Sequence, residues 1–205
     1  MTLRLHDYLP SGNGYKVRLL MTQLGIPFER IEYNITKGET RTPVYLENVN
    51  ANGRIPVLET ETGEFLPESN AILFYLAEGT PFLPDGRFDR AQALRWMFFE
   101  QYNHEPNIAV ARAWLHVFDT EMTEERRGAL EVKQKLGYDA LCVMEEHLEG
   151  GRFFVGERYS VADIALYAYT HVADEGGFDL EGFPAVRAWL ERVSAQPGYI
   201  PITQD

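Results

Sequence analysis

The first eighty residues alternate between short apolar runs and turn residues. Residues 2–7 alternate apolar and polar side chains, which predicts a strand, and apolar residues then recur at helical spacing up to Gly25. Later runs predict a strand near 28–33, a short helix at 42–50, an antiparallel pair of strands at 55–60 and 64–66, and a helix at 69–78. The predicted order is β-α-β-α-β-β-α, and its first two strands must be parallel because a helix connects them.

Beyond residue 80 the pattern has only the helical period. Proline and glycine residues mark a linker over 81–87. Four helical segments follow, predicted over 88–118, 123–148, 160–173 and 183–194. Pro106 should kink or end the first of them, and leucines such as Leu136 and Leu141 should face inward on the second. We therefore expect an α/β domain over 1–80 and an all-α domain over 88–205.

Composition excludes several classes of protein. The 205 residues carry a net charge of −12, so the basic face that a nucleic-acid partner requires is not expected. No apolar run approaches the roughly 18 residues of a membrane span, so no membrane partner is expected. The single cysteine, Cys142, cannot form a disulfide within the chain, which favours a cytoplasmic location. Its place between Leu141 and Met144 predicts a buried, structural thiol.

The segment Ser11-Gly12-Asn13-Gly14 lies between the first strand and the first helix. Unpaired N–H groups and the helix dipole favour an anion at such a position. The simpler explanation is that Ser11 or Asn13 only caps the helix. Both explanations remain open from these residues alone.

Two further segments carry the same ambiguity. A cis Ile55–Pro56 bond would present the Ile55 backbone to a peptide-like ligand, whereas a trans bond would only start a strand. Glu68 and Ser69 either start a helix or aim a carboxylate and a hydroxyl at an amino-acid head group.

Other kinds of chemistry have little support. Ser160 and Asp163 form a capping box, which specifies the fold rather than a reaction. The five histidines include no pair at i, i+4 spacing and have no cysteine partners, so no metal is expected. The chain also has no glycine-rich phosphate loop.

Taken together, the motifs resemble one family. The order strand, S-G-N-G, helix, then N-G-R-I-P-V-L, P-E-S-N-A-I-L-F-Y-L-A and Y-S-V-A-D-I resembles the cytosolic glutathione transferases over residues 1–195. The run S-G-N-G-Y-K-V-R resembles the serine- or asparagine-using bacterial classes related to theta and nu. The resemblance implies a thioredoxin-like glutathione-binding domain, an all-α helical bundle and a homodimer.

The resemblance also implies roles for residues at the matching positions. Ser11 or Asn13 would donate a hydrogen bond to the glutathione sulfur, with Ser11 the first choice. Ile55 would pair with the cysteinyl moiety beside a cis Pro56. Glu68 and Ser69 would hold the ammonium and carboxylate of the γ-glutamyl group. The glycyl carboxylate would meet Arg41 or Arg54, with Lys37 as a further candidate.

Three functions are consistent with these residues. The first is a transferase that joins glutathione, as co-substrate, to small hydrophobic electrophiles. The second is a glutathione-dependent disulfide or peroxide reductase, in which glutathione supplies the thiols because no cysteine occurs at 11–14. The third is a non-catalytic interaction module. Ser11, Glu68 and Ser69 are all present, which favours the enzymes over the module.

Overall fold

The computed structural model describes residues 2–118 and 121–204 and consists of two compact units. The first unit is Met1–Thr80 together with Pro197–Asp205, and the second is Pro81–Gln196. The C-terminal segment therefore belongs with the first unit, whereas the sequence placed it in the all-α domain.

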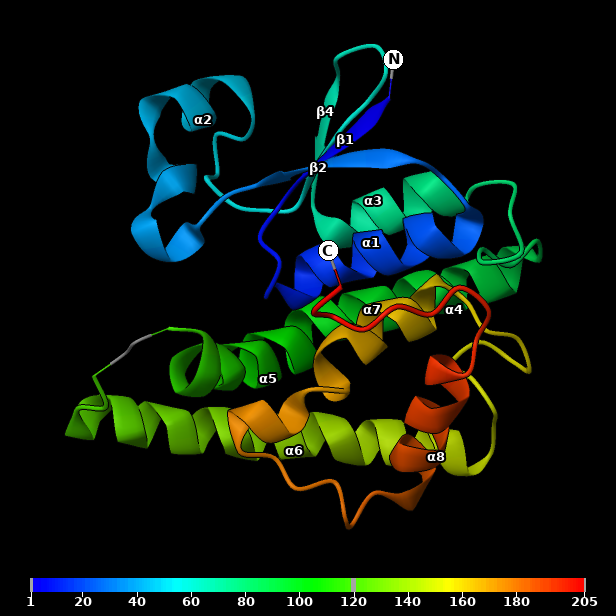
Figure 1. The fold of residues 1–205 in the computed structure, drawn as a ribbon. Helices are drawn as coiled ribbons and strands as arrows, with labels where there is room; N and C mark the ends of the chain where they lie inside the picture. The colour runs from blue at the N-terminus through cyan, green and yellow to red at the C-terminus, as the bar shows by residue number, and fades with distance from the viewer. Residues whose placement is uncertain (1, 119–120, 205) are drawn as a thin grey trace. The chain divides into compact units, whose positions relative to one another are not determined.

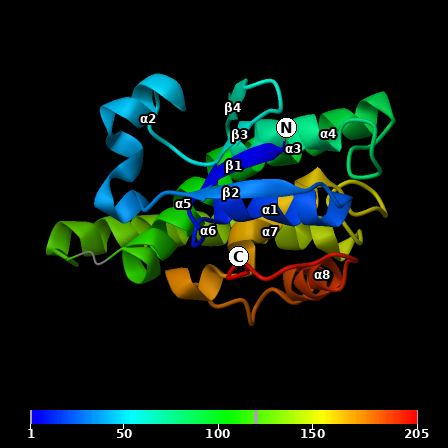
Figure 2. The same cartoon turned by 45° about the horizontal axis from the view of Figure 1, so that its top comes forward.

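The first unit is built on a four-stranded sheet in the order β2-β1-β3-β4 (Figure 2). Its elements, in chain order, are β1 (Leu3–Asp7), α1 (Gly12–Leu24), β2 (Phe28–Glu32), α2 (Pro43–Asn48), β3 (Val57–Glu59), β4 (Phe65–Pro67) and α3 (Ser69–Ala77). β1 and β2 are parallel, and β3 is antiparallel to both β1 and β4. The predicted order β-α-β-α-β-β-α is confirmed.

Two helices cover one face of this sheet. α1 and α3 lie side by side against it, whereas α2 lies beyond the end of β2 (Figure 1). α1 ends at Gly25, whose φ of 67° is the left-handed conformation that glycine adopts without strain. Fully buried leucines from β1, α1 and β3 form the core of the unit: Leu5, Leu19, Leu20 and Leu58.

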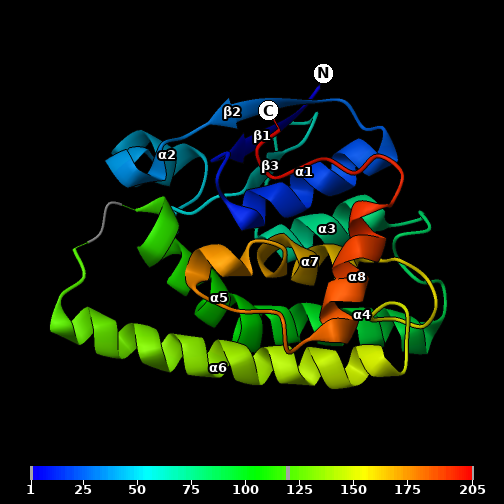
Figure 3. The same cartoon turned by 60° about the horizontal axis from the view of Figure 1, so that its bottom comes forward.

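The C-terminal segment is tied to α1 by three hydrogen bonds. The Tyr15 hydroxyl donates to the Ile200 carbonyl at 2.7 Å. Arg18 donates from Nη1 to the carbonyls of Ile202 and Gln204 at 3.1 and 2.9 Å. This segment, drawn in red, runs along α1 in Figures 1 and 3.

The second unit is helical. Its helices are α4 (Arg87–Phe99), α5 (Glu105–Arg112), α6 (Glu124–Glu149), α7 (Val161–Thr170) and α8 (Pro184–Ser194). All ten residues of α7 are buried, and α4, α5 and α8 pack against it. Across the described residues, none of the helices has the length and apolarity that crossing a membrane requires.

The first predicted helix of this unit is interrupted close to Pro106, as expected. The backbone is π-helical over Glu100–His104, and the Glu105 N–H bonds to the Glu100 carbonyl, five residues back. α5 then starts with Pro106 in its first turn, the part of a helix in which proline is tolerated.

Two expectations for α6 are wrong. Cys142 is exposed, and Leu136 is 44% exposed. The buried face of α6 is Gly137, Ala140, Leu141, Met144 and Leu148. Residues 136 and 142 each lie one helical step, about 100°, away from this face, so the helix turns them outward.

The capping box at the start of α7 is confirmed, and it also joins two helices. The Asp163 carboxylate accepts hydrogen bonds from the Ser160 N–H at 2.9 Å and the Ser160 hydroxyl at 3.1 Å. It also accepts one from the Trp189 indole of α8 at 2.9 Å and one from the Phe154 N–H at 3.1 Å. A single buried carboxylate therefore holds α7, α8 and the turn before them together.

Candidate functional site

Three segments of the first unit meet at one end of its sheet. β1 leaves the sheet at Asp7, next to the point where β3 enters it, because His6 pairs with Val57. β4 leaves the sheet at the same end, because Val57 also pairs with Pro67. The Ser11–Gly14 turn, the Ile55–Pro56 bond and the Glu68–Ser69 pair are thus brought together by strand register alone.

Ser11 is the N-cap of α1. Its Oγ accepts a hydrogen bond from the Gly14 N–H at 3.2 Å, and its backbone is extended, with φ −72° and ψ 124°. The first turn of α1 has no acidic side chain of its own, and its N–H groups carry the partial positive charge of the helix N-terminus. The capping explanation and the anion-binding explanation therefore apply to the same turn.

Asn13 and Ser69 are brought into direct contact. The Ser69 hydroxyl, at the start of α3, donates to Asn13 Oδ1 at 3.2 Å. The Lys16 ammonium group donates to the same oxygen at 2.8 Å and lies 3.4 Å from Ser69 Oγ. Lys16 and Ser69 are both buried. The result is a compact polar cluster that joins α1 to α3.

The peptide bond between Ile55 and Pro56 is cis, as the resemblance implies. It precedes β3, whose first residue is Val57. Pro56 is buried and Ile55 is half-buried. The Ile55 backbone therefore lies outside the strand ladder, at the edge where a peptide-like ligand would pair with it.

Glu68 has an uncommon backbone conformation. Its φ is 74°, and among the residues that the structure describes it is the one residue other than glycine with a positive φ. Its side chain is exposed and makes no capping bond to α3, although its carbonyl accepts from the Ile72 N–H at 2.9 Å. Such strained positions are common at ligand sites, so this conformation supports a role for Glu68 in binding.

A buried ion pair lies beneath the turn. Asp7 Oδ2 is 2.9 Å from Arg18 Nε, and Arg18 Nη2 donates to the Leu9 carbonyl at 2.7 Å. Burial raises the pKa of Asp7 to about 6, although the Arg18 guanidinium opposes this. A Cβ atom added to Gly14 would lie 1.6 Å from Asp7 Oδ1, so only glycine fits there. The Asp7 carboxylate and Arg18 thereby fix the path of the chain into α1.

The three candidates for the glycyl carboxylate belong to the segment between β2 and the cis Ile55–Pro56 bond. Arg41 donates to the Asn52 carbonyl at 3.0 Å and packs against Gly53, which holds it on the loop before β3. The Arg54 carbonyl accepts from the Tyr45 hydroxyl at 2.8 Å, and its side chain is exposed. Lys37 is also exposed. Binding of the glycyl carboxylate by Arg41, Arg54 or Lys37 therefore stays a prediction.

Sequence reasoning missed two residues of this region, Lys16 and Asp7. Lys16 follows Asn13 by three positions, so the two share a helix face, and that spacing was a usable signal. Asp7 ends a strand and gives no sign in the sequence that it will be buried against Gly14 and Arg18. Only the packing of α1 on the sheet shows it.

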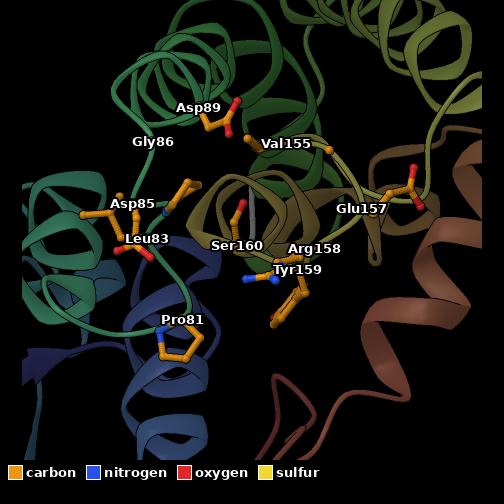
Figure 4. A pocket seen from close by; sticks show the side chains of 12 residues that line it. Pro81, Leu83, Asp85, Gly86, Asp89, Val155, Glu157, Arg158, Tyr159 and Ser160 are labelled. Atoms are coloured by element: carbon orange, nitrogen blue, oxygen red, sulfur yellow. The ribbon is translucent and has the colours of Figure 1, made fainter.

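The second unit contains a cavity of about 360 Å³. It lies between the 81–86 segment with Asp89 and the 155–160 turn (Figure 4). Asp85, Asp89 and Glu157 line it together with Arg158. Four charged side chains do not suit a pocket for an apolar electrophile.

Within 2–118 and 121–204 there is also no group of three or more His, Cys, Asp or Glu side chains arranged to hold a metal.

Comparisons with known proteins identify the family of both domains. Residues 1–78 match the family model "Glutathione S-transferase, N-terminal domain", and residues 107–197 match "Glutathione S-transferase, C-terminal domain". The disulfide-bond oxidoreductase YfcG of Escherichia coli is 30% identical over 197 residues, covering 93% of this chain and 89% of that protein.

Solved structures are similar over the full length. The crystal structure of a glutathione S-transferase from Pseudomonas fluorescens has a TM-score of 0.95 and 48% identity, covering 100% of both chains. The glutathione transferase URE2P6 from Phanerochaete chrysosporium, in complex with oxidized glutathione, has a TM-score of 0.84 and 27% identity, covering 96% of this chain and 92% of that one. On its motifs, its fold and both domain matches, the chain belongs to the glutathione S-transferase family.

Proposed function

We propose that this protein is a glutathione transferase that ionises the glutathione thiol at the N-terminus of α1 and directs it to small apolar electrophiles. The observation that carries the proposal is the meeting of the Ser11–Gly14 turn, the cis Ile55–Pro56 bond and the Glu68–Ser69 pair at one end of the sheet. The Ser11–Gly14 turn offers an anion site, and the Ile55 backbone offers an edge for a peptide-like ligand. Glu68 and Ser69 offer polar groups for the ammonium and carboxylate of an amino acid.

The energy available is sufficient for the chemistry. A thiol with a pKa of about 8.5 is roughly 3% ionised at pH 7. Lowering that pKa by about two units requires about 2.7 kcal/mol. One hydrogen bond to a charged group supplies about 1.5–3 kcal/mol. The helix N-terminus adds about 0.3–1 kcal/mol. A side-chain donor on this turn and the helix dipole together therefore meet the requirement.

Substitutions of Glu68 and Ser69 test the proposed binding of the γ-glutamyl group of glutathione. Glu68→Gln and Ser69→Ala should each weaken glutathione binding by roughly ten- to a hundred-fold, the equivalent of about 1.5–3 kcal/mol. Isothermal titration calorimetry measures this directly. Unchanged affinity in both variants would remove this pair from the site.

A reductase is the second candidate, because the relative YfcG is named a disulfide-bond oxidoreductase. Glutathione thiolate would attack one sulfur of a disulfide, release a thiol and form a mixed disulfide. A second glutathione would then release the other thiol and leave as oxidized glutathione. Turnover of a chloronitrobenzene supports the transferase, and turnover of hydroxyethyl disulfide alone supports the reductase.

We also infer that the protein works as a homodimer in the cytoplasm, where reduced glutathione is available. Two groups of exposed apolar side chains on the second unit support the dimer. Val132, Leu136 and Val143 share one face of α6, and Phe98 and Tyr102 are 71% and 84% exposed. Sedimentation should give twice the chain mass of 23.5 kDa. A single species of one chain mass at micromolar concentration would refute it.

A further inference from the structure

We propose that Lys16 is a positioning residue that holds the Asn13 amide with its N–H end toward the glutathione sulfur. The inference rests on the proposed function, because it concerns the same thiol. It assigns a task to a buried cation that the sequence left without one, and it gives Asn13, the alternative to Ser11 as sulfur donor, an orientation set by other residues.

The orientation of the amide follows from its partners. A lysine ammonium group has three donors and no acceptor, so it faces only the oxygen of an asparagine side chain. Lys16 Nζ lies 2.8 Å from Asn13 Oδ1. The Ser69 hydroxyl donates to the same oxygen at 3.2 Å. Two donors thus fix Oδ1, and the planar amide presents its Nδ2–H groups on the other side.

The Ser11 hydroxyl is engaged differently. Its oxygen accepts the Gly14 N–H at 3.2 Å, which is the usual task of an N-cap serine. That bond leaves the Ser11 O–H able to donate as well, whereas the Ser69 hydroxyl donates its proton to Asn13. The Asn13 amide differs from the Ser11 hydroxyl in that two other side chains, Lys16 and Ser69, hold it in one orientation.

Lys16 is also suited to the task by its surroundings. Its side chain is fully buried, and it donates to Asn13 and Ser69, which both belong to the proposed site. A positive charge hydrogen-bonded to the amide oxygen polarises the amide and strengthens the bond that its N–H donates. Lys16 thereby acts on the sulfur through Asn13 without touching it.

The test is the pKa of the thiol in the glutathione complex, followed by thiolate absorbance in the ultraviolet. Lys16→Met keeps the length of the chain but removes the donor and the charge, and it should raise the thiol pKa by roughly one unit. Lys16→Arg keeps donors and charge and should restore most of the shift. Lys135→Met removes an exposed charge on α6 and should leave the thiol pKa unchanged.

A double variant separates positioning from a simple charge effect. If Lys16 acts through Asn13, Lys16→Met combined with Asn13→Ala should raise the thiol pKa no further than Asn13→Ala alone. Full additivity of the two shifts, or an unmoved pKa in Lys16→Met, would overturn the proposal. If Lys16→Met does not fold, Lys16→Gln replaces it, and an unmoved pKa there counts in the same way.

Binding of S-methylglutathione, whose sulfur cannot ionise, provides the structural control. A folded Lys16→Met variant should bind it within about threefold of the wild type, because only the interaction with a thiolate is lost. A much larger loss would show that Lys16 merely supports the site and would overturn its assigned task. Failure of the wild-type protein to bind glutathione at all would refute the proposed function itself, whatever the variants do.

Discussion

Gly14 is the residue at which α1 comes closest to the sheet. A Cβ atom there would lie 1.6 Å from Asp7 Oδ1, which is far inside van der Waals contact. Asp7 cannot easily move away, because its carboxylate is buried and paired with Arg18 at 2.9 Å. The absence of one side chain thus sets the position of the turn that carries Ser11 and Asn13.

Gly14→Ala should therefore destabilise the protein by about 1–3 kcal/mol or more and weaken glutathione binding. Gly128→Ala is the matched control, since Gly128 also lies within a helix but has no atom within 4 Å of its added Cβ. That change should stabilise α6 by about 0.5–1 kcal/mol through helix propensity. Urea unfolding of both variants measures the difference, and equal effects of the two substitutions would contradict this account.

His171 gives stability a dependence on pH. Burial lowers its pKa to about 4, and its Nδ1–H donates to the Tyr167 carbonyl at 2.8 Å. The unfolded chain, with a pKa near 6.5, binds the proton more readily. The stability that comes from burying a neutral His171 is therefore fully present above about pH 6.5, and it is lost as the pH falls toward 4.

The wild-type protein should lose about 1–2 kcal/mol more than His171→Gln when the pH falls from 7 to 5. Denaturant midpoints at the two pH values, measured for both proteins, give the comparison. Parallel losses in the two proteins would show that other groups cause the pH dependence.

At the scale of elements, Asp163 joins three parts of the second unit. Asp163→Ala should leave the Trp189 indole N–H and the Phe154 and Ser160 N–H groups without this acceptor, and it should cost about 3–5 kcal/mol. Asp163→Asn keeps one acceptor oxygen and should cost less. Thermal unfolding distinguishes the two, and a loss below about 1 kcal/mol in Asp163→Ala would argue against the bridging role.

Elements with a clear period were predictable from the sequence, and contacts between elements were not. The capping box at Ser160 and the interruption near Pro106 depend on neighbouring residues, and both are confirmed. Cys142 was placed inward because Leu141 beside it is apolar, although one step along a helix turns a side chain by about 100°. Candidate residues such as Ser69 were named, but its bond to Asn13, 56 positions away, required the packing of α3 on α1.

At the scale of the whole molecule, the chain returns to its first unit at the end. Removing residues 197–205 should destabilise that unit by several kcal/mol. The deletion removes the acceptors of Tyr15 and Arg18 and the buried side chains of Ile200 and Ile202, worth about 1.5–3 kcal/mol each. Urea unfolding followed by the fluorescence of the tyrosines, and glutathione affinity, would both report it. Full stability of the truncated protein would refute this role of the segment.

The same return of the chain has a consequence for biosynthesis. The first unit, although it contains the N-terminus, is discontinuous in sequence, and the entire second unit is inserted between its two parts. A ribosome makes about 5–20 residues each second and releases the N-terminal part first. Tyr15 and Arg18 can bond to the carbonyls of Ile200 and Gln204 only after the whole second unit has been synthesised. The first unit, whose longer part precedes the second unit in the sequence, is therefore completed only after the second unit has been synthesised.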